Sequence, residues 1–147
     1  MSWAAPLQIV DQQGLEQCLS FWKEVLGLQP WAIQVMFDRA ENLDGYPANI
    51  RYEATREMGV LRVRDPRDWY GFAWKQDVEV SIVHELLHLV FWPFDHLDRN
   101  PLAGAHEEQI VDRLARSLVT LRRRGNIPIV SPVPPSLVRE VGADRGA

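Results

Sequence analysis

Residues 77–93 read DVEVSIVHELLHLVFWP, a long apolar run that contains few polar residues and stops at a proline. Because Pro93 cannot continue a helix, this run predicts one helix from about Asp77 to Trp92. Apolar residues occur on nearly every side of that helix, which is typical of a buried helix. The two histidines and the glutamates inside it are therefore the residues that need an explanation.

One helix and three strands are expected before this buried helix. The first is amphipathic and is ended by Gly27 and Pro30, and three segments with strand-like alternation follow it. These elements are expected at residues 11–28, 31–37, 48–54 and 60–64. After Pro93, a loop leads into a long helix from about Ala105 to Arg124, which Gly125 closes. The predicted fold class is α+β, with an antiparallel or mixed sheet that carries its helices on one side.

Length and composition suit one domain followed by a tail. The chain has 147 residues, of which 46% are hydrophobic, so a core can form without disulfides. We expect a single domain over residues 1–125 and a Pro-rich tail over residues 126–147, whose prolines prevent regular structure. Cys18 is the only cysteine. It lies on the apolar face of the first helix and is interpreted as a core residue.

The charge of the chain and the lengths of its apolar runs bear on its expected binding partners and cellular location. The net charge of −4 gives no reason to expect nucleic-acid binding. Arg122, Arg123 and Arg124 end the last helix, where positive charge is favourable. Neither a signal peptide nor a membrane-spanning run of ~18 apolar residues is recognisable, and one cysteine fits a reducing compartment. These features predict a cytoplasmic protein without membrane contact.

The motif inside the buried helix is His84-Glu85-Leu86-Leu87-His88. Residues four apart lie above one another on a helix, so His84 and His88 can each offer one ring nitrogen to the same Zn²⁺. Glu85 would then lie beside the metal, where a carboxylate can take a proton from water. Burying these groups is costly unless a metal or hydrogen bonds satisfy them, and we favour the metal.

This segment looks like the active-site helix of the zincin metallopeptidases. Glu108 lies twenty residues after His88 and is followed by Asp112, which is similar to the pattern of gluzincins such as thermolysin. The resemblance covers roughly residues 11–124. It implies that His84, His88 and Glu108 hold Zn²⁺ and that Asp112 supports a ligand histidine through the other ring nitrogen of that histidine. It also implies a minimal zincin-like core.

Two other residues are alternatives for the third metal ligand. Glu107 lies near the centre of the apolar stripe formed by Ile110, Val111, Leu114, Leu118 and Leu121, so helical periodicity favours it over Glu108. His96 would give a three-histidine site, as in metzincins or in small bacterial endoribonucleases. The spacing from His88 to His96 is longer than in either family, and there is no methionine after Met58 for a metzincin turn.

The function that the resemblance implies is that of a zinc metallopeptidase acting on peptide or protein substrates. Glu85 would be the general base that activates a metal-bound water. In zincins an edge strand pairs with extended substrate, and residues 58–64 are expected to be that strand. Candidates for the oxyanion-stabilising residue are Tyr52, Tyr70, His96 and His106. The alternatives are a non-catalytic zinc-binding interaction module and a metal-dependent endoribonuclease that uses His96.

Overall fold

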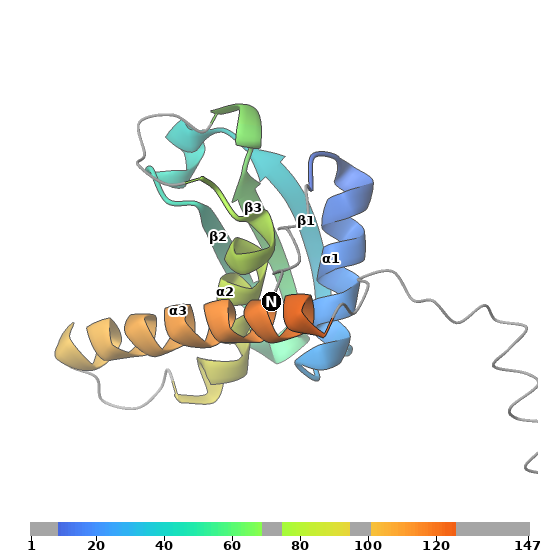
Figure 1. Ribbon diagram of the computed structural model, residues 1–147. Helices are drawn as coiled ribbons and strands as arrows, with labels where there is room; N and C mark the ends of the chain where they lie inside the picture. Colours follow the sequence, from blue (N-terminus) through green and yellow to red (C-terminus); the bar gives the residue numbers. More distant parts are fainter. Residues whose placement is uncertain (1–8, 69–74, 95–100, 126–147) are drawn as a thin grey trace, which may run out of the picture.

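The computed structural model describes residues 9–68, 75–94 and 101–125, and it has the predicted α+β fold (Figure 1). Short 3-10 turns join some of its helices and strands. The main elements are α1 (Gln12–Val25), β1 (Ala32–Asp38), β2 (Ala48–Glu53), β3 (Met58–Arg64), α2 (Val78–Phe91) and α3 (Pro101–Arg124). Each expected helix and strand is confirmed to within a few residues, and α3 begins four residues earlier than expected. None of the helices in the described segments has the length and apolar content that crossing a bilayer requires.

Helix α1 is delimited by local capping contacts. The Asp11 side chain accepts a hydrogen bond from the Gly14 N–H at 2.7 Å, which satisfies one of the free donors of the first turn. At the other end Gly27 adopts a φ of 70°, a left-handed conformation that glycine tolerates best. Cys18 is fully buried on the inner face of α1, and burial raises the pKa of its thiol. The interpretation of Cys18 as a core residue is confirmed.

The sheet is mixed and has the order β1-β3-β2. β3 pairs in parallel with β1 and antiparallel with β2, with Leu61 opposite both Val35 and Ile50. The expectation that residues 58–64 form the edge strand is therefore wrong. β3 follows β2 after a short turn and pairs with β2, as expected for neighbouring strands. β3 also inserts between β2 and β1, so both of its edges are paired. The open edge near α2 belongs to β2.

The core lies between one face of the sheet and the helices. α2 runs through the middle of the fold and contacts α1, α3, β2 and β3 (Figure 1). Its buried side chains explain why it reads as apolar on all sides: Val78, Glu79, Ile82, Val83, Leu86, Leu87 and Leu89. On the other face of the sheet, Gln34, Arg51 and Val60 are exposed. The prediction that the sheet carries its helices on one side is thus confirmed.

Helix α3 lies across α2 and turns a different face to the core than its apolar residues suggest. The buried positions of α3 are Val111, Ala115, Val119 and Arg122. Ile110, Leu114 and Leu121, which belong to the apolar stripe seen in the sequence, are 50%, 39% and 62% exposed. Only part of that stripe faces the core. The small Ala115 allows α3 to approach α2 closely, which a leucine at this position would hinder.

A buried cluster of charged groups joins the three helices. The Glu79 carboxylate is fully buried and accepts hydrogen bonds from Trp22 Nε1 at 3.0 Å and from Arg122 Nε and Nη2, both at 2.7 Å. Arg123 donates to both oxygens of Asp77 at 2.9 Å. Two of the three arginines that end α3 therefore point inward to carboxylates of α2. The role of these two arginines is therefore explained more by the ion pairs than by the favourable effect of positive charge at the C-terminus of α3.

We predict that Glu79→Gln lowers the free energy of unfolding by about 3–5 kcal/mol, because it leaves the Arg122 guanidinium buried without its anionic partner. Urea unfolding followed by circular dichroism measures this change. Arg113→Met serves as the control, because Arg113 is an exposed arginine of the same helix and its loss should cost within about 0.5 kcal/mol. Equal stabilities of the two variants would contradict a central role of the buried ion pair.

Candidate metal centre

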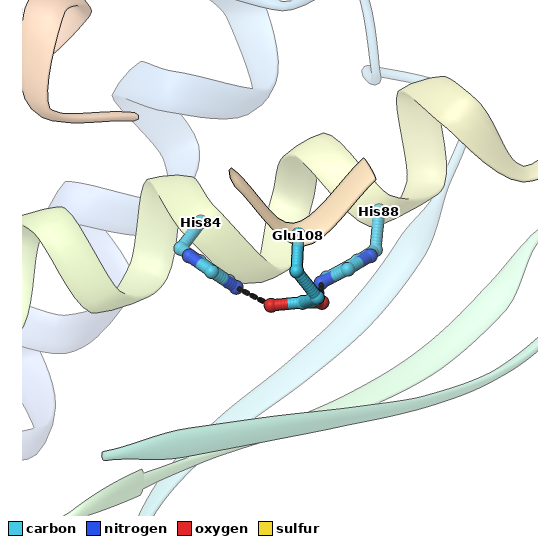
Figure 2. Close-up of side chains that lie close together, drawn as sticks. All are labelled: His84, His88 and Glu108. Atoms are coloured by element: carbon cyan, nitrogen blue, oxygen red, sulfur yellow. Dashed lines mark ion pairs between the residues drawn. The ribbon is translucent and has the colours of Figure 1, made fainter. Parts of the chain in front are cut away.

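Helices α2 and α3 bring two histidines and a glutamate together (Figure 2). His84 and His88 lie one helical turn apart on the same side of α2, with ring centroids 5.2 Å apart. The Nε2 atom of His84 is 3.2 Å from one carboxylate oxygen of Glu108, and the Nε2 atom of His88 is 2.8 Å from the other. Each of the three residues offers a ligand atom, and these atoms lie within 4.8 Å of one another.

The other ring nitrogens of the two histidines face carboxylates as well. His84 Nδ1 is 3.7 Å from Asp112 Oδ1, and His88 Nδ1 is 4.0 Å from Glu107 Oε1. A carboxylate that accepts a hydrogen bond from Nδ1 would hold the imidazole in the tautomer whose Nε2 lone pair can bind a metal, and it would raise the basicity of that nitrogen. Each histidine therefore has one carboxylate at Nε2 and a different one at Nδ1.

This arrangement separates the roles of Glu107 and Glu108. Glu107 is largely buried, with 15% of its side chain exposed, and it faces the outer nitrogen of His88. Glu108 is 57% exposed and lies between the two Nε2 atoms. With about 100° per residue, the buried face of α3 centres about 25° from Glu108 and about 75° from Glu107. The structure thus brings Glu108 to the histidine pair and gives Glu107 a supporting position.

The donor set fits a metal ion such as Zn²⁺. Two imidazole nitrogens and one carboxylate are ligands that zinc takes in catalytic sites, where a fourth position stays open to water. In the tautomer that carries its proton on Nδ1, each Nε2 is an acceptor, as the Glu108 carboxylate is, so a cation between them would satisfy all three groups. The cluster could therefore hold a metal ion. His96, the other alternative ligand, lies outside the described residues.

Glu85 lies next to this cluster and is held by the sheet. Its carboxylate accepts a hydrogen bond from the backbone N–H of Ile50 in β2. The pKa of Glu85 is raised to about 7, first by burial and then by the negative charge of Glu108, while the Ile50 hydrogen bond acts in the opposite direction. A carboxyl whose pKa lies near neutrality is suited to gain and lose a proton at that pH.

A cleft of about 730 Å³ contains these residues and is bounded by β2, α2 and α3. Its described lining residues are Tyr46, Pro47, Ala48, Asn49, Ile50, Tyr52, Val80, Ser81, His84, Glu85, His88, Glu108, Asp112 and Arg116. One wall is therefore the edge strand of the sheet, and the opposite wall is the α2–α3 pair. The cluster of His84, His88 and Glu108 therefore shares one cavity with Glu85.

The wall formed by β2 has backbone groups that point away from β3. The Arg64 N–H donates to the Pro47 carbonyl at 2.9 Å, and antiparallel pairs alternate between bonded and non-bonded positions. The bonded positions that follow are Asn49 and Arg51, so the N–H and C=O groups of Ala48, Ile50 and Tyr52 point away from β3. The hydrogen bond from Ile50 to Glu85 agrees with this direction.

The expected oxyanion-stabilising candidates do not all reach the cleft. Tyr52 lines it, with its ring packed edge-on against Trp31 at 6.0 Å. His106 is exposed on α3 and does not line it, and Tyr70 and His96 lie outside the described residues. Sequence reasoning missed Tyr46 and Arg116 as cleft residues. Arg116 follows Asp112 by one helical turn, a spacing that could have indicated a shared face.

Comparison of the chain with protein-family models, with curated proteins and with solved structures finds no match in any of the three. The geometry of this cleft and the resemblance of its motif are therefore what bears on the function.

We predict that the purified protein binds one zinc ion per chain and that Glu108→Ala abolishes this binding, because it removes a ligand. Glu107→Ala and Asp112→Ala should keep the site but weaken zinc binding by about 10–100-fold, because they remove only the support of a histidine. Competition with a chromogenic chelator measures the affinities. His106→Ala is the control, and its zinc affinity should equal that of wild type. If Glu107→Ala abolishes binding and Glu108→Ala does not, the ligand assignment is reversed.

Proposed function

We propose that this protein is a zinc-dependent metallopeptidase of the gluzincin type that hydrolyses peptide bonds in this cleft. The observation that carries the proposal is the convergence of His84, His88 and Glu108 beside Glu85 and an open strand edge. His84, His88 and Glu108 would hold the zinc. A zinc ion bound there would polarise the scissile carbonyl and make water a nucleophile near neutral pH.

Glu85 is the proposed general base. It is placed to accept the proton of the attacking water and to pass it to the leaving amine. Burial keeps bulk water from competing for its proton, and the N–H of Ile50 holds one side of the carboxylate. Because Ile50 belongs to the strand that lines the cleft, Glu85 is also fixed relative to the place where substrate would lie.

The open edge of β2 favours an extended peptide as the substrate. The N–H and C=O groups of Ala48, which point away from β3, can pair with a peptide backbone, which would extend the sheet by one strand. Such pairing uses main-chain groups and therefore accepts many sequences, while side-chain specificity must come from other residues of the cleft. The hydroxyls of Tyr46 and Tyr52 are the proposed donors to the developing oxyanion. The cytoplasmic location remains a prediction from the sequence.

We predict that Glu85→Gln keeps the zinc stoichiometry of wild type but lowers kcat/KM by about 10²–10⁴-fold, because the amide cannot accept a proton. A panel of fluorescence-quenched peptides measures cleavage, and elemental analysis measures zinc. His106→Gln is the matched control on an exposed histidine and should leave both values unchanged.

The result for Glu85→Gln also separates the alternatives. Zinc binding without cleavage by wild type, and a variant indistinguishable from it, would support a zinc-binding interaction module instead of a peptidase. Cleavage of RNA that depends on His96 would support the endoribonuclease.

A further inference from the structure

We propose that Arg116 determines substrate specificity by binding a carboxylate of the peptide within about four residues of the cleaved bond. This inference rests on the proposed peptidase function and deepens it, because it names a class of substrate. It concerns a residue that lines the same cleft as His84, His88 and Glu108 but is neither a proposed metal ligand nor the proposed general base.

Arg116 differs in charge from the rest of the cleft. Glu85, Glu108 and Asp112 carry the acidic groups of its wall, and the β2 side contributes only uncharged side chains. Among the described residues that line the cleft, Arg116 alone is an arginine or lysine. A substrate carboxylate would therefore find one permanent positive charge at a defined place. Zinc would neutralise much of the acidic charge near the ligands, which lowers the repulsion of such a substrate.

The guanidinium of Arg116 is oriented but only partly used. Its Nε donates to Asp112 Oδ2 at 3.1 Å, while the other oxygen of Asp112 faces His84. No further hydrogen bond or ion pair of Arg116 occurs among the described residues, and none of these residues occupies its two terminal amino groups. The side chain is 63% exposed, so a ligand can reach it. A planar guanidinium with free donors is suited to bind a carboxylate, and its remaining contact with Asp112 restricts its rotation.

The position of Arg116 on α3 limits how far from the cleaved bond the bound carboxylate can lie. It lies two helical turns after Glu108, about 12 Å along α3 at 1.5 Å per residue. An extended peptide covers that length in about four residues. The contacts of Asp112 with His84 and of Glu107 with His88 show that α3 and α2 run in opposite senses here. Arg116 therefore lies toward the end of the cleft that Val80 and Ser81 line.

The test uses the full-length, zinc-loaded protein and peptides that differ only in charge. One series is blocked at both ends and carries Glu, Gln or Lys at each of the four positions on either side of the cleaved bond. A second series carries Gln and a free terminal carboxylate, which distinguishes a chain end from an acidic side chain. Wild type should cleave the best carboxylate peptide with a kcat/KM about tenfold above that of its Lys counterpart.

The variants are Arg116→Glu, Arg116→Gln and the control Arg113→Glu, which makes the same charge change at an exposed position of α3 outside the cleft. Arg116→Glu should reverse the preference toward Lys, and Arg116→Gln should remove it. Arg113→Glu should leave the ratio as in wild type. Equal ratios in the Arg116 and Arg113 variants would overturn the proposal, as would a change in zinc affinity that accounts for the whole effect.

Binding provides a readout that does not need cleavage. Calorimetry on the zinc-loaded Glu85→Gln protein should show a Kd for the Glu peptide about tenfold lower than in the Glu85→Gln, Arg116→Glu double variant. If wild type cleaves no peptide but this difference is present, the peptidase proposal fails and the carboxylate site stands. If peptides are cleaved without any dependence on Arg116, the carboxylate site fails and the peptidase stands. If neither cleavage nor a binding difference occurs, both fail.

Discussion

The buried carboxylate of Glu79 is the point at which α1, α2 and α3 meet. A fully buried carboxylate is costly unless donors surround it, and Trp22 and Arg122 provide them from the two neighbouring helices. Because these hydrogen bonds are directional, they fix how far α3 can rotate or slide on α2. An apolar contact at the same place would bury as much surface but would define the register of the two helices less sharply.

The register of α3 on α2 in turn decides which side chains face the histidine pair. The apolar positions Val111, Ala115 and Val119 continue the contact from the Glu79 cluster toward the metal site. At the far end of this contact, Glu108 points between the two Nε2 atoms, and Asp112 and Glu107 lie behind the rings. A rotation of α3 by one residue position would exchange these roles. The geometry of the candidate metal site thus depends on a structural ion pair several turns away.

The sheet makes an equally specific contribution on the other side of the cleft. Because β3 inserts between β1 and β2, the strand beside α2 keeps one free edge. That edge supplies the N–H that holds Glu85 and leaves further backbone groups accessible to a ligand. The cleft therefore combines an acidic wall that could hold a metal ion with a strand edge that has no sequence preference of its own. Among the described lining residues, Arg116 adds the one positive charge.

The elements and the histidine pair could be read from the sequence, because they depend on interactions between residues close together in the chain. Helix ends follow from caps such as Asp11 and Gly27, and the side-by-side position of His84 and His88 follows from their spacing of four. The buried nature of α2 also followed from its composition alone. These features would be the same in almost any packing of the chain.

Three other features required the tertiary structure. Ile110, Leu114 and Leu121 look like a core face but are exposed, so periodicity pointed to Glu107 where packing places Glu108. The edge strand was misplaced, because strand order depends on pairings between distant segments. The sequence also did not reveal that Arg122 points inward, because its partner Glu79 lies forty-three residues away in the chain. The sequence determined which elements form and which residues share a helix face. Packing decided which face turns inward, because neighbouring helix positions differ by only about 100° and only contacts with other elements select among them.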